Sequence, residues 1–142
     1  MLISTKGRYA LRVMIDLSEH AEDGFIPLKV IARRQEISEK YLESIIRLLV
    51  KARLLNGLRG KGGGYRLTKA PDAYTVGAIL RLTEESLAPV ACLEKDAAAC
   101  PRASSCRTLP MWRGLDEVIG RYLDGITLAD LVGQEMGGNY VI

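Results

Sequence analysis

The segment 28–68 constrains the fold most, because two short helical patterns in it are followed by a glycine-rich turn between two apolar stretches. Pro27 suits the first turn of a helix over LKVIARRQE, and Ser38, after a brief turn at Ile37, is a suitable N-cap for a second helix. Apolar residues at helical spacing are expected to bury one face of the second helix: Leu42, Ile45, Ile46 and Leu49. Two helices joined by so short a turn are typical of a helix-turn-helix.

Directly after this pair, two short strands are predicted around Leu54–Arg59 and Tyr65–Thr68, separated by GKGGG. Four glycines in five residues permit positive φ angles and a close approach of the backbone to another molecule. The sequence therefore predicts a β-hairpin wing. The GxxxxGK(S/T) and GxGxxG patterns are absent in the strand–turn–helix setting they need, so the turn is not interpreted as a nucleotide-binding loop.

Helical patterns flank this unit on both sides. The first is expected over about Lys6–Ala21, and Thr75 can cap another over VGAILRLTEE. A long amphipathic helix is predicted over LPMWRGLDEVIGRYLDG, with Gly125 as its C-cap. Its apolar stripe consists of Leu109, Trp112, Leu115, Ile119, Tyr122 and Leu123. A small domain cannot cover this stripe alone, so we expect a second subunit against it and a last turn, ITLADLVG, packed beside it.

Charge is distributed unevenly along the chain. Residues 1–70 hold 14 Lys and Arg against 7 Asp and Glu, a balance of +7, whereas residues 71–142 hold 6 against 10, a balance of −4. The sum agrees with the net charge of +3. This asymmetry favours a polyanion-binding N-terminal half, with a solvated surface of chance asymmetry as the alternative.

Composition narrows the class of protein further. No run approaches 18 apolar residues and no signal peptide is recognisable, so we expect no membrane span and a reducing cytoplasm. The chain has one histidine, no nucleophile–base pair and no paired-carboxylate pattern, so we do not expect an enzyme.

The three cysteines, Cys92, Cys100 and Cys106, all lie in one predicted loop with the spacing C-x7-C-x5-C. An odd number of clustered thiols in a reducing compartment favours metal ligands or redox sensors over a disulfide. The spacing is not CxxC, but three thiolates can supply part of an iron–sulfur site. Nearby Lys95, Arg102 and Arg107 would lower thiol pKa values in either case. A cluster or metal site, a thiol switch and incidental thiols all stay open on spacing alone.

Several motifs in order resemble one known family. They are TKGRYALRVMIDL, ISEKYLESII, RGKGGGYRL, the cysteine loop, the MW near the start of the long helix, and ITLADLV. Together they resemble the IscR/NsrR family of bacterial winged-helix iron–sulfur regulators (Rrf-type), over nearly the whole length. The resemblance implies a homodimer that binds double-stranded DNA, at a palindromic operator, with a cluster near the dimer interface.

The resemblance also implies roles for individual residues. Cys92, Cys100 and Cys106 are in the positions of the cluster ligands. The recognition-helix positions that meet the major groove are Ser38, Lys40, Tyr41 and Glu43, and the wing positions that meet the minor groove are Arg59, Gly60, Lys61, Gly62 and Gly63. Chemically, Glu43 can accept a hydrogen bond from a cytosine amino group and Arg59 suits a narrow minor groove. Lys40, Arg47 and Lys61 are expected to contact phosphates, and Tyr41 can also be half in the core.

One departure from the family pattern concerns the fourth ligand. Some relatives have a histidine three residues after the third cysteine, where this chain has Leu109, and others use a residue of the partner's first helix, where this chain has Arg8 and Arg12. His20 is expected at the surface. Other candidates are a small molecule or one of Glu94, Asp96, Ser104 and Ser105. The choice between a 2Fe–2S and a 4Fe–4S cluster therefore stays open.

The sequence thus predicts a mainly α fold with a small β-hairpin wing. We expect a winged helix-turn-helix domain over 1–70, a connecting helix over 71–91, a cluster-binding loop over 92–107, a dimerisation helix with a short terminal helix over 108–133, and a disordered tail over 134–142. The expected function is a dimeric DNA-binding transcriptional regulator, such as a repressor, whose operator affinity depends on the cluster. The alternative is a winged-helix regulator that senses oxidants through its thiols without a cluster.

Overall fold

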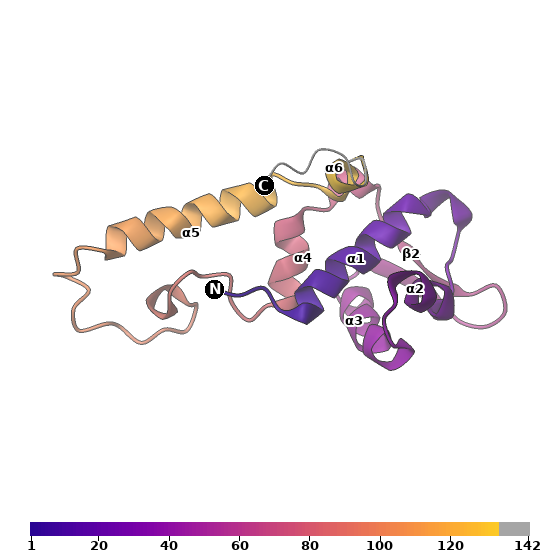
Figure 1. The fold of residues 1–142 in the computed structure, drawn as a ribbon, viewed down its shortest axis with the longest axis horizontal. Helices are drawn as coiled ribbons and strands as arrows, with labels where there is room; N and C mark the ends of the chain where they lie inside the picture. The colour runs from indigo at the N-terminus through magenta and orange to yellow at the C-terminus, as the bar shows by residue number, and fades with distance from the viewer. Residues whose placement is uncertain (134–142) are drawn as a thin grey trace.

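The computed structural model describes residues 1–133, and the predicted disorder of the tail lies outside these residues. In chain order the elements are α1 (Thr5–Glu19), α2 (Leu28–Gln35), α3 (Glu39–Lys51), β1 (Leu55–Leu58), β2 (Gly64–Leu67), α4 (Val76–Thr83), α5 (Leu109–Asp124) and α6 (Leu128–Val132). Short 3-10 turns cover 21–23, 71–73 and 91–93. The predicted mainly helical fold with one β-hairpin is confirmed (Figure 1).

The core lies where α1, α2 and α3 meet. All four residues predicted to bury one face of α3 are buried, and the α1 residues Ala10, Val13 and Met14 are fully buried against them. Tyr9, which belongs to the same predicted stripe, is only partly buried and packs at the edge of the core. The helix-turn-helix is therefore held mainly by aliphatic packing on α1.

The wing is an antiparallel pair in which Leu55 lies opposite Leu67 and Leu58 opposite Gly64. The first predicted strand extended from Leu54 to Arg59, but both of these residues lie outside β1. Gly64, which was expected in the turn, begins β2. Gly64 has a φ of +147°, and a Cβ there would lie 2.2 Å from the Ile26 carbonyl oxygen. Glycine is thus required where β2 pairs with Ile26, which exchanges two 2.9 Å backbone hydrogen bonds with Tyr65.

The chain returns to the body of the molecule after α5. The Val76 N–H donates to the Ile126 carbonyl at 2.9 Å, and the Leu128 N–H donates to the Tyr74 carbonyl at 3.0 Å. Leu128 is fully buried, and α6 packs against α1. The expectation that ITLADLVG packs beside the long helix was wrong, because the backbone pairing with residues 74–76 directs α6 back to the core.

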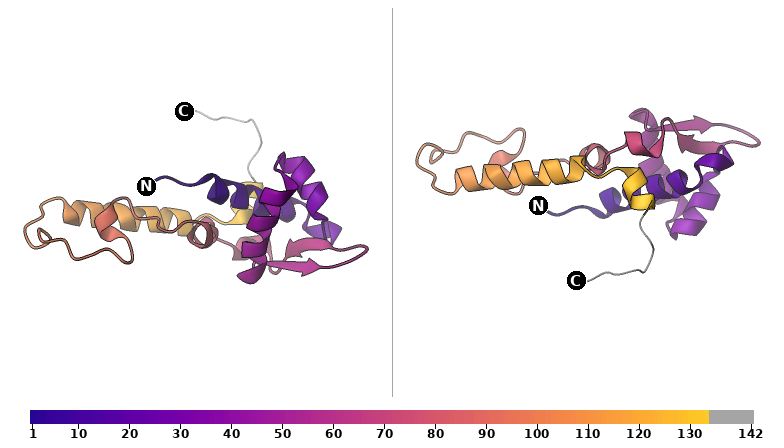
Figure 2. Two further views of the ribbon diagram at one scale, coloured as in Figure 1. Left: turned by 90° about the horizontal axis from the view of Figure 1, so that it is seen from below. Right: turned by 90° about the horizontal axis from the view of Figure 1, so that it is seen from above.

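Helix α5 extends away from this body, and the loop that precedes it forms the far end of the molecule (Figures 1 and 2). Within the described residues it contains no buried side chain. Of the predicted stripe, Leu109, Trp112, Ile119 and Leu123 are half-buried, whereas Leu115 and Tyr122 are exposed. No helix of the described chain is long and apolar enough to cross a membrane.

One ion pair fixes the C-terminal end of α5 to α4. Arg81 donates to Asp124 at 2.6 and 3.1 Å, and this hydrogen bonding holds the pKa of the Asp124 carboxyl below its ordinary value. Gly77, which is buried on α4, leaves the room for that carboxylate, because a Cβ there would lie 2.0 Å from Oδ1 of Asp124.

Gly→Ala in a helix usually raises the free energy of unfolding by about 1 kcal/mol. At Gly77 the added Cβ would displace the half-exposed Asp124 carboxylate and disturb an ion pair worth about 0–1 kcal/mol, so Gly77→Ala should stabilise the protein less than Gly114→Ala does. Gly114→Ala on α5 is the matched control, since nothing lies within 4 Å of the added Cβ. Urea denaturation of both variants tests this, and a Gly77→Ala protein stabilised as much as Gly114→Ala would contradict it.

Candidate DNA-binding face and cysteine loop

The N-terminus of α3 is organised by Ser38, as the sequence predicted. The Ser38 Oγ accepts a hydrogen bond from the Tyr41 N–H at 3.2 Å. Lys40, Glu43 and Arg47 are exposed, and Tyr41 is half-buried against the core, so the predicted polar face points to solvent. These side chains are therefore available to an approaching molecule, and their contacts with DNA stay a prediction.

Glu43 and Arg47 form an ion pair that the sequence interpretation missed. Arg47 Nη2 donates to Glu43 Oε1 at 3.0 Å, and both side chains are mostly exposed, at 76% and 57% respectively. Their i, i+4 spacing was the signal that could have revealed it. An exposed pair of this kind contributes only about 0.3–0.5 kcal/mol, so it can open readily when either side chain meets another partner.

The wing presents Arg59 beside α3. Arg59, Gly60, Lys61 and Gly62 are exposed, and Gly63 is half-buried where a Cβ would lie 2.1 Å from the Leu58 carbonyl oxygen. Between wing and α3 lies a groove with an apolar floor and a charged rim. The groove is lined by Glu43, Ile46, Arg47, Val50, Lys51, Gly57, Leu58, Arg59 and Tyr65. The structure thus brings charged residues of the predicted helix and wing sites to one surface.

The cysteine loop connects α4 to α5. Cys92 and Cys100 are exposed, Cys106 is half-buried just before α5, and all three thiols are free. Among the described residues, no group of three or more His, Cys, Asp or Glu side chains is close enough together to hold a metal ion. The structure therefore does not bring the three predicted ligands together.

Cys106 nevertheless has a distinct environment. Its Sγ lies 3.5 Å from the Thr108 Oγ1, and hydrogen bonds from Thr108, together with the Leu109 backbone, lower the pKa of the Cys106 thiol. Hydrogen bonds of this kind favour the thiolate, which is the form that binds metals.

The candidates for a fourth ligand are not assembled either. Glu94, Asp96, Ser104 and Ser105 are exposed on the loop. His20 was expected at the surface but is half-buried at the end of α1, where its Nδ1 lies 2.8 Å from the Asp16 carbonyl oxygen.

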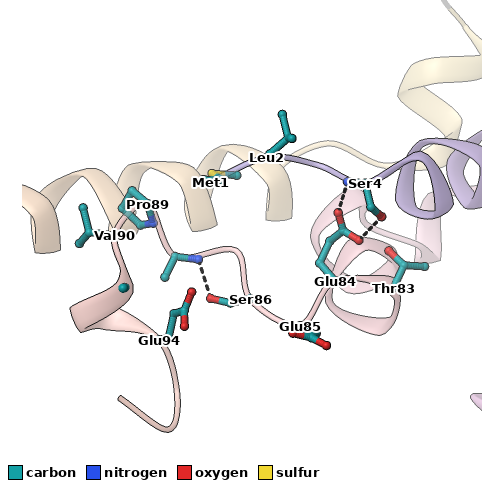
Figure 3. Close-up of a pocket in the computed structure, with 12 residues that line it drawn as sticks. Met1, Leu2, Ser4, Thr83, Glu84, Glu85, Ser86, Pro89, Val90 and Glu94 are labelled. Carbon is teal, nitrogen blue, oxygen red and sulfur yellow. Dashed lines mark hydrogen bonds between the residues drawn. The ribbon is translucent and has the colours of Figure 1, made fainter. Parts of the chain in front are cut away.

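A pocket beside the start of the loop is shown in Figure 3. In it Glu84, which follows α4, accepts hydrogen bonds from the Ser4 N–H and, at 2.6 Å, from the Ser4 hydroxyl. Burial raises the pKa of the Glu84 carboxyl, but these hydrogen bonds outweigh it, so the pKa lies below its ordinary value. Ser4 is also the N-cap of α1, through the Gly7 N–H at 3.0 Å. The segment that leads to Cys92 is thus tied to the start of α1.

A helix-turn-helix followed by a β-hairpin, with an exposed polar recognition helix, defines the winged-helix class. The model of the Rrf2 family, described as iron-dependent transcriptional regulator, matches residues 3–134. The chain belongs to this family and is a transcriptional regulator. The family resemblance found in the sequence is confirmed, as is the expectation of a regulator and not an enzyme, since the relatives are named as regulators.

Individual relatives agree with this assignment. The HTH-type transcriptional regulator IscR of Erwinia tasmaniensis is 42% identical over 135 residues, which are 95% of this chain and 81% of the relative. Among solved structures, CymR, the global cysteine regulator of B. subtilis, has a TM-score of 0.78 and 37% identity, over 96% of this chain and 99% of that one. T. potens IscR has a TM-score of 0.74 and 36% identity, over 96% of this chain and 94% of that one.

The cap on α3 yields a direct test. Ser38→Ala removes the acceptor for the Tyr41 N–H and should lower the free energy of unfolding by about 1 kcal/mol. Ser38→Asp keeps a capping oxygen and should stay within about 0.5 kcal/mol of wild type. Urea unfolding of the three proteins measures both differences, and equal losses in both variants would show that the cap is not the cause.

Proposed function

We propose that the protein is a dimeric DNA-binding transcriptional regulator whose operator affinity is controlled by an iron–sulfur cluster held by Cys92, Cys100 and Cys106. The observation that carries this proposal is that every thiol of the chain lies free on one loop, at the free end of the long helix α5. The description of the family as iron-dependent supports the same assignment. As a regulator of transcription, the protein would act in the bacterial cytoplasm.

The DNA-binding part of the proposal rests on charge and shape. Residues 1–70 carry the +7 balance, and within the described chain only Arg34 and Arg47 of their cations form ion pairs. Unpaired cations on a helix and a neighbouring wing suit the phosphates on either side of a groove. In the proposed complex α3 enters the major groove, with Ser38, Lys40, Tyr41 and Glu43 at its base edges, and Arg59 to Gly63 reach the minor groove.

The donor set of the loop fits an iron–sulfur cluster in its chemistry. Such clusters are held by cysteine thiolates and normally have four protein ligands, so the three cysteines supply three of them. No residue from 92 to 105 is buried, so the loop can bring its thiols together without disrupting the core. A fourth ligand would come from the loop, a partner or a small molecule, which would make that position exchangeable.

The proposed dimer interface is the apolar face of α5. Four large apolar side chains on it are exposed by 40–68%, at intervals of four, three and four residues, which place them along one side of the helix. They are Met111, Leu115, Val118 and Tyr122. This spacing matches the seam of a helix pair, and a second copy of α5 would cover it. Dimerisation would present two recognition helices to the two halves of a palindromic operator.

Control by the cluster is proposed as a population shift between two arrangements of the dimer. A bound cluster supplies a fixed anchor for the three thiols. With the thiols gathered, Cys106 would pull on the first turn of α5, whose other end is fixed to α4 by Arg81 and Asp124. A change in the direction of α5 would then alter the spacing or tilt of the two recognition helices.

The first test is made on protein purified without oxygen. Wild type should show visible absorption bands and contain iron and sulfide, whereas a variant with all three cysteines replaced by alanine should be colourless, because it lacks the thiolate ligands. DNA affinity should differ between the cluster-bound and cluster-free wild type and should be the same with and without iron in the variant. Circular dichroism serves as the control, since an exposed loop contributes little to folding.

A wild-type protein without iron, sulfide or zinc, even after reconstitution, would refute the cluster. In that case peroxide would be added to the cluster-free protein. A loss of DNA binding that is absent from the alanine variant would establish the alternative, a regulator that senses oxidants directly through its thiols.

The dimer is tested by Leu115→Glu. A carboxylate at the centre of an apolar interface costs several kcal/mol, so the dissociation constant of the dimer should rise by at least about 100-fold. Arg113→Glu is the control, because this exposed residue lies on the opposite side of α5 from the stripe. Sedimentation equilibrium distinguishes the two variants, and a Leu115→Glu protein that stays dimeric would place the interface elsewhere.

A further inference from the structure

One side of α1 holds the helix-turn-helix at both ends of its turn. At the start of α3, the ring of Tyr41 packs edge-on against Tyr9, with the centroids 5.9 Å apart and the planes at 75°. At the end of α2, the side chain of Gln35 bonds to Arg12 and, through its amide at 2.8 Å, to Asp16. Both ends of the turn are therefore attached to neighbouring positions of one helix.

Arg12 connects these two attachments. Its guanidinium lies over the Tyr9 ring, 4.8 Å from the centroid. The same group donates from Nε to the side-chain oxygen of Gln35 at 3.2 Å and from Nη2 to the Gln35 backbone carbonyl. A planar group can stack and donate in this way at once, which a lysine ammonium cannot do.

The far side of the network is anchored in the protein interior. Asp16 is only 2% exposed, and Arg34 donates to its two oxygens at 2.6 and 3.1 Å. Gln35, which Arg12 bonds, is thus itself fixed by a buried carboxylate. The turn between these two attachments includes Glu36, the C-cap of α2, whose φ of 54° lies in the left-handed region.

We propose that Tyr9 and Arg12 are positioning residues that set the first turn of α3, and with it Tyr41, for sequence-specific DNA binding. This inference rests on the proposed DNA-binding function. Contacts with base edges depend on orientation, whereas phosphate contacts depend mainly on charge. Loss of the support from α1 would therefore weaken binding to the correct sequence and leave general affinity for DNA unchanged.

Arg12→Lys tests the inference, because it keeps the charge and removes the stacked, two-armed contact. The probes are a palindromic duplex selected from random DNA with the wild-type protein, and a scrambled duplex of equal composition. Arg12→Lys and Arg12→Gln should both bind the selected duplex about three- to tenfold more weakly, in line with the loss of a stacked cation and a hydrogen bond. Binding to the scrambled duplex and the salt dependence of binding should equal those of wild type.

Two further variants separate positioning from charge and from folding. Arg8→Gln removes an exposed cation one turn away from Arg12. Within the described chain, the Arg8 side chain bonds only to Thr5. The Arg8→Gln protein should therefore bind the selected duplex without the loss of selectivity expected for Arg12→Gln. Tyr9→Phe keeps the ring and should bind like wild type, whereas Tyr9→Leu should repeat the Arg12→Lys defect. Urea unfolding confirms that each variant is folded under the conditions of the assay.

Other outcomes of these experiments would contradict the inference or the proposed function. If Arg12→Lys binds normally and Arg12→Gln lowers the slope of log affinity against log salt concentration by about one, Arg12 contacts a phosphate and the inference is wrong. It is also wrong if wild type selects a duplex that all Arg12 and Tyr9 variants bind equally well. A wild-type protein that selects no duplex would instead refute the proposed DNA-binding function.

Discussion

Burial of the apolar face of α1 is the interaction on which the rest of the structure depends. Ala10, Val13 and Met14 are fully buried, and the helix that carries them contacts α2, α3, α4, α6 and β2. Because packing in such a core is dense and aliphatic, each of these elements takes its position from α1 as well as from its neighbours in the chain. The helix-turn-helix, the base of the wing and the returning C-terminal helix are thus arranged around one central helix.

Helix α5 shows what happens without this support. Its half-buried residues face α4 and the loop, but the four side chains of its stripe from Met111 to Tyr122 are left 40–68% exposed in the described chain. An exposed apolar seam of about three turns is unusual for a protein that stays monomeric, because such surface is normally covered. The same extension keeps the cysteine loop away from the recognition helix, so any influence of the loop on DNA binding must travel through α5, α4 or α1.

The sequence predicted those features that depend on neighbours along the chain. Ser38 and Thr75 cap the helices they were expected to cap, the buried face of α3 is correct, and the glycines of the wing occupy a turn that needs them. Features that depend on distant residues were missed or wrong. The Ser4–Glu84 contact joins residues 80 positions apart, and the position of α6 follows from backbone pairing that no local pattern encodes. The convergence of the three thiols on a cluster stays a prediction, since sequence spacing limits their reach but does not bring them together.

The two ends of α1 face the two parts of the molecule that the proposed regulation must connect. At its start, Ser4 is bonded to Glu84, which stands eight residues before Cys92. Further along, Arg12 and Asp16 hold the end of α2. A helix is stiff over this length, so a displacement of the segment that follows Glu84 would reach, through α1, the residues that hold the end of α2. The physical continuity from loop to recognition helix therefore runs through α1 as well as through α5. In the proposed dimer the two routes would differ in kind, because α5 would act on the relation between subunits and α1 within each subunit.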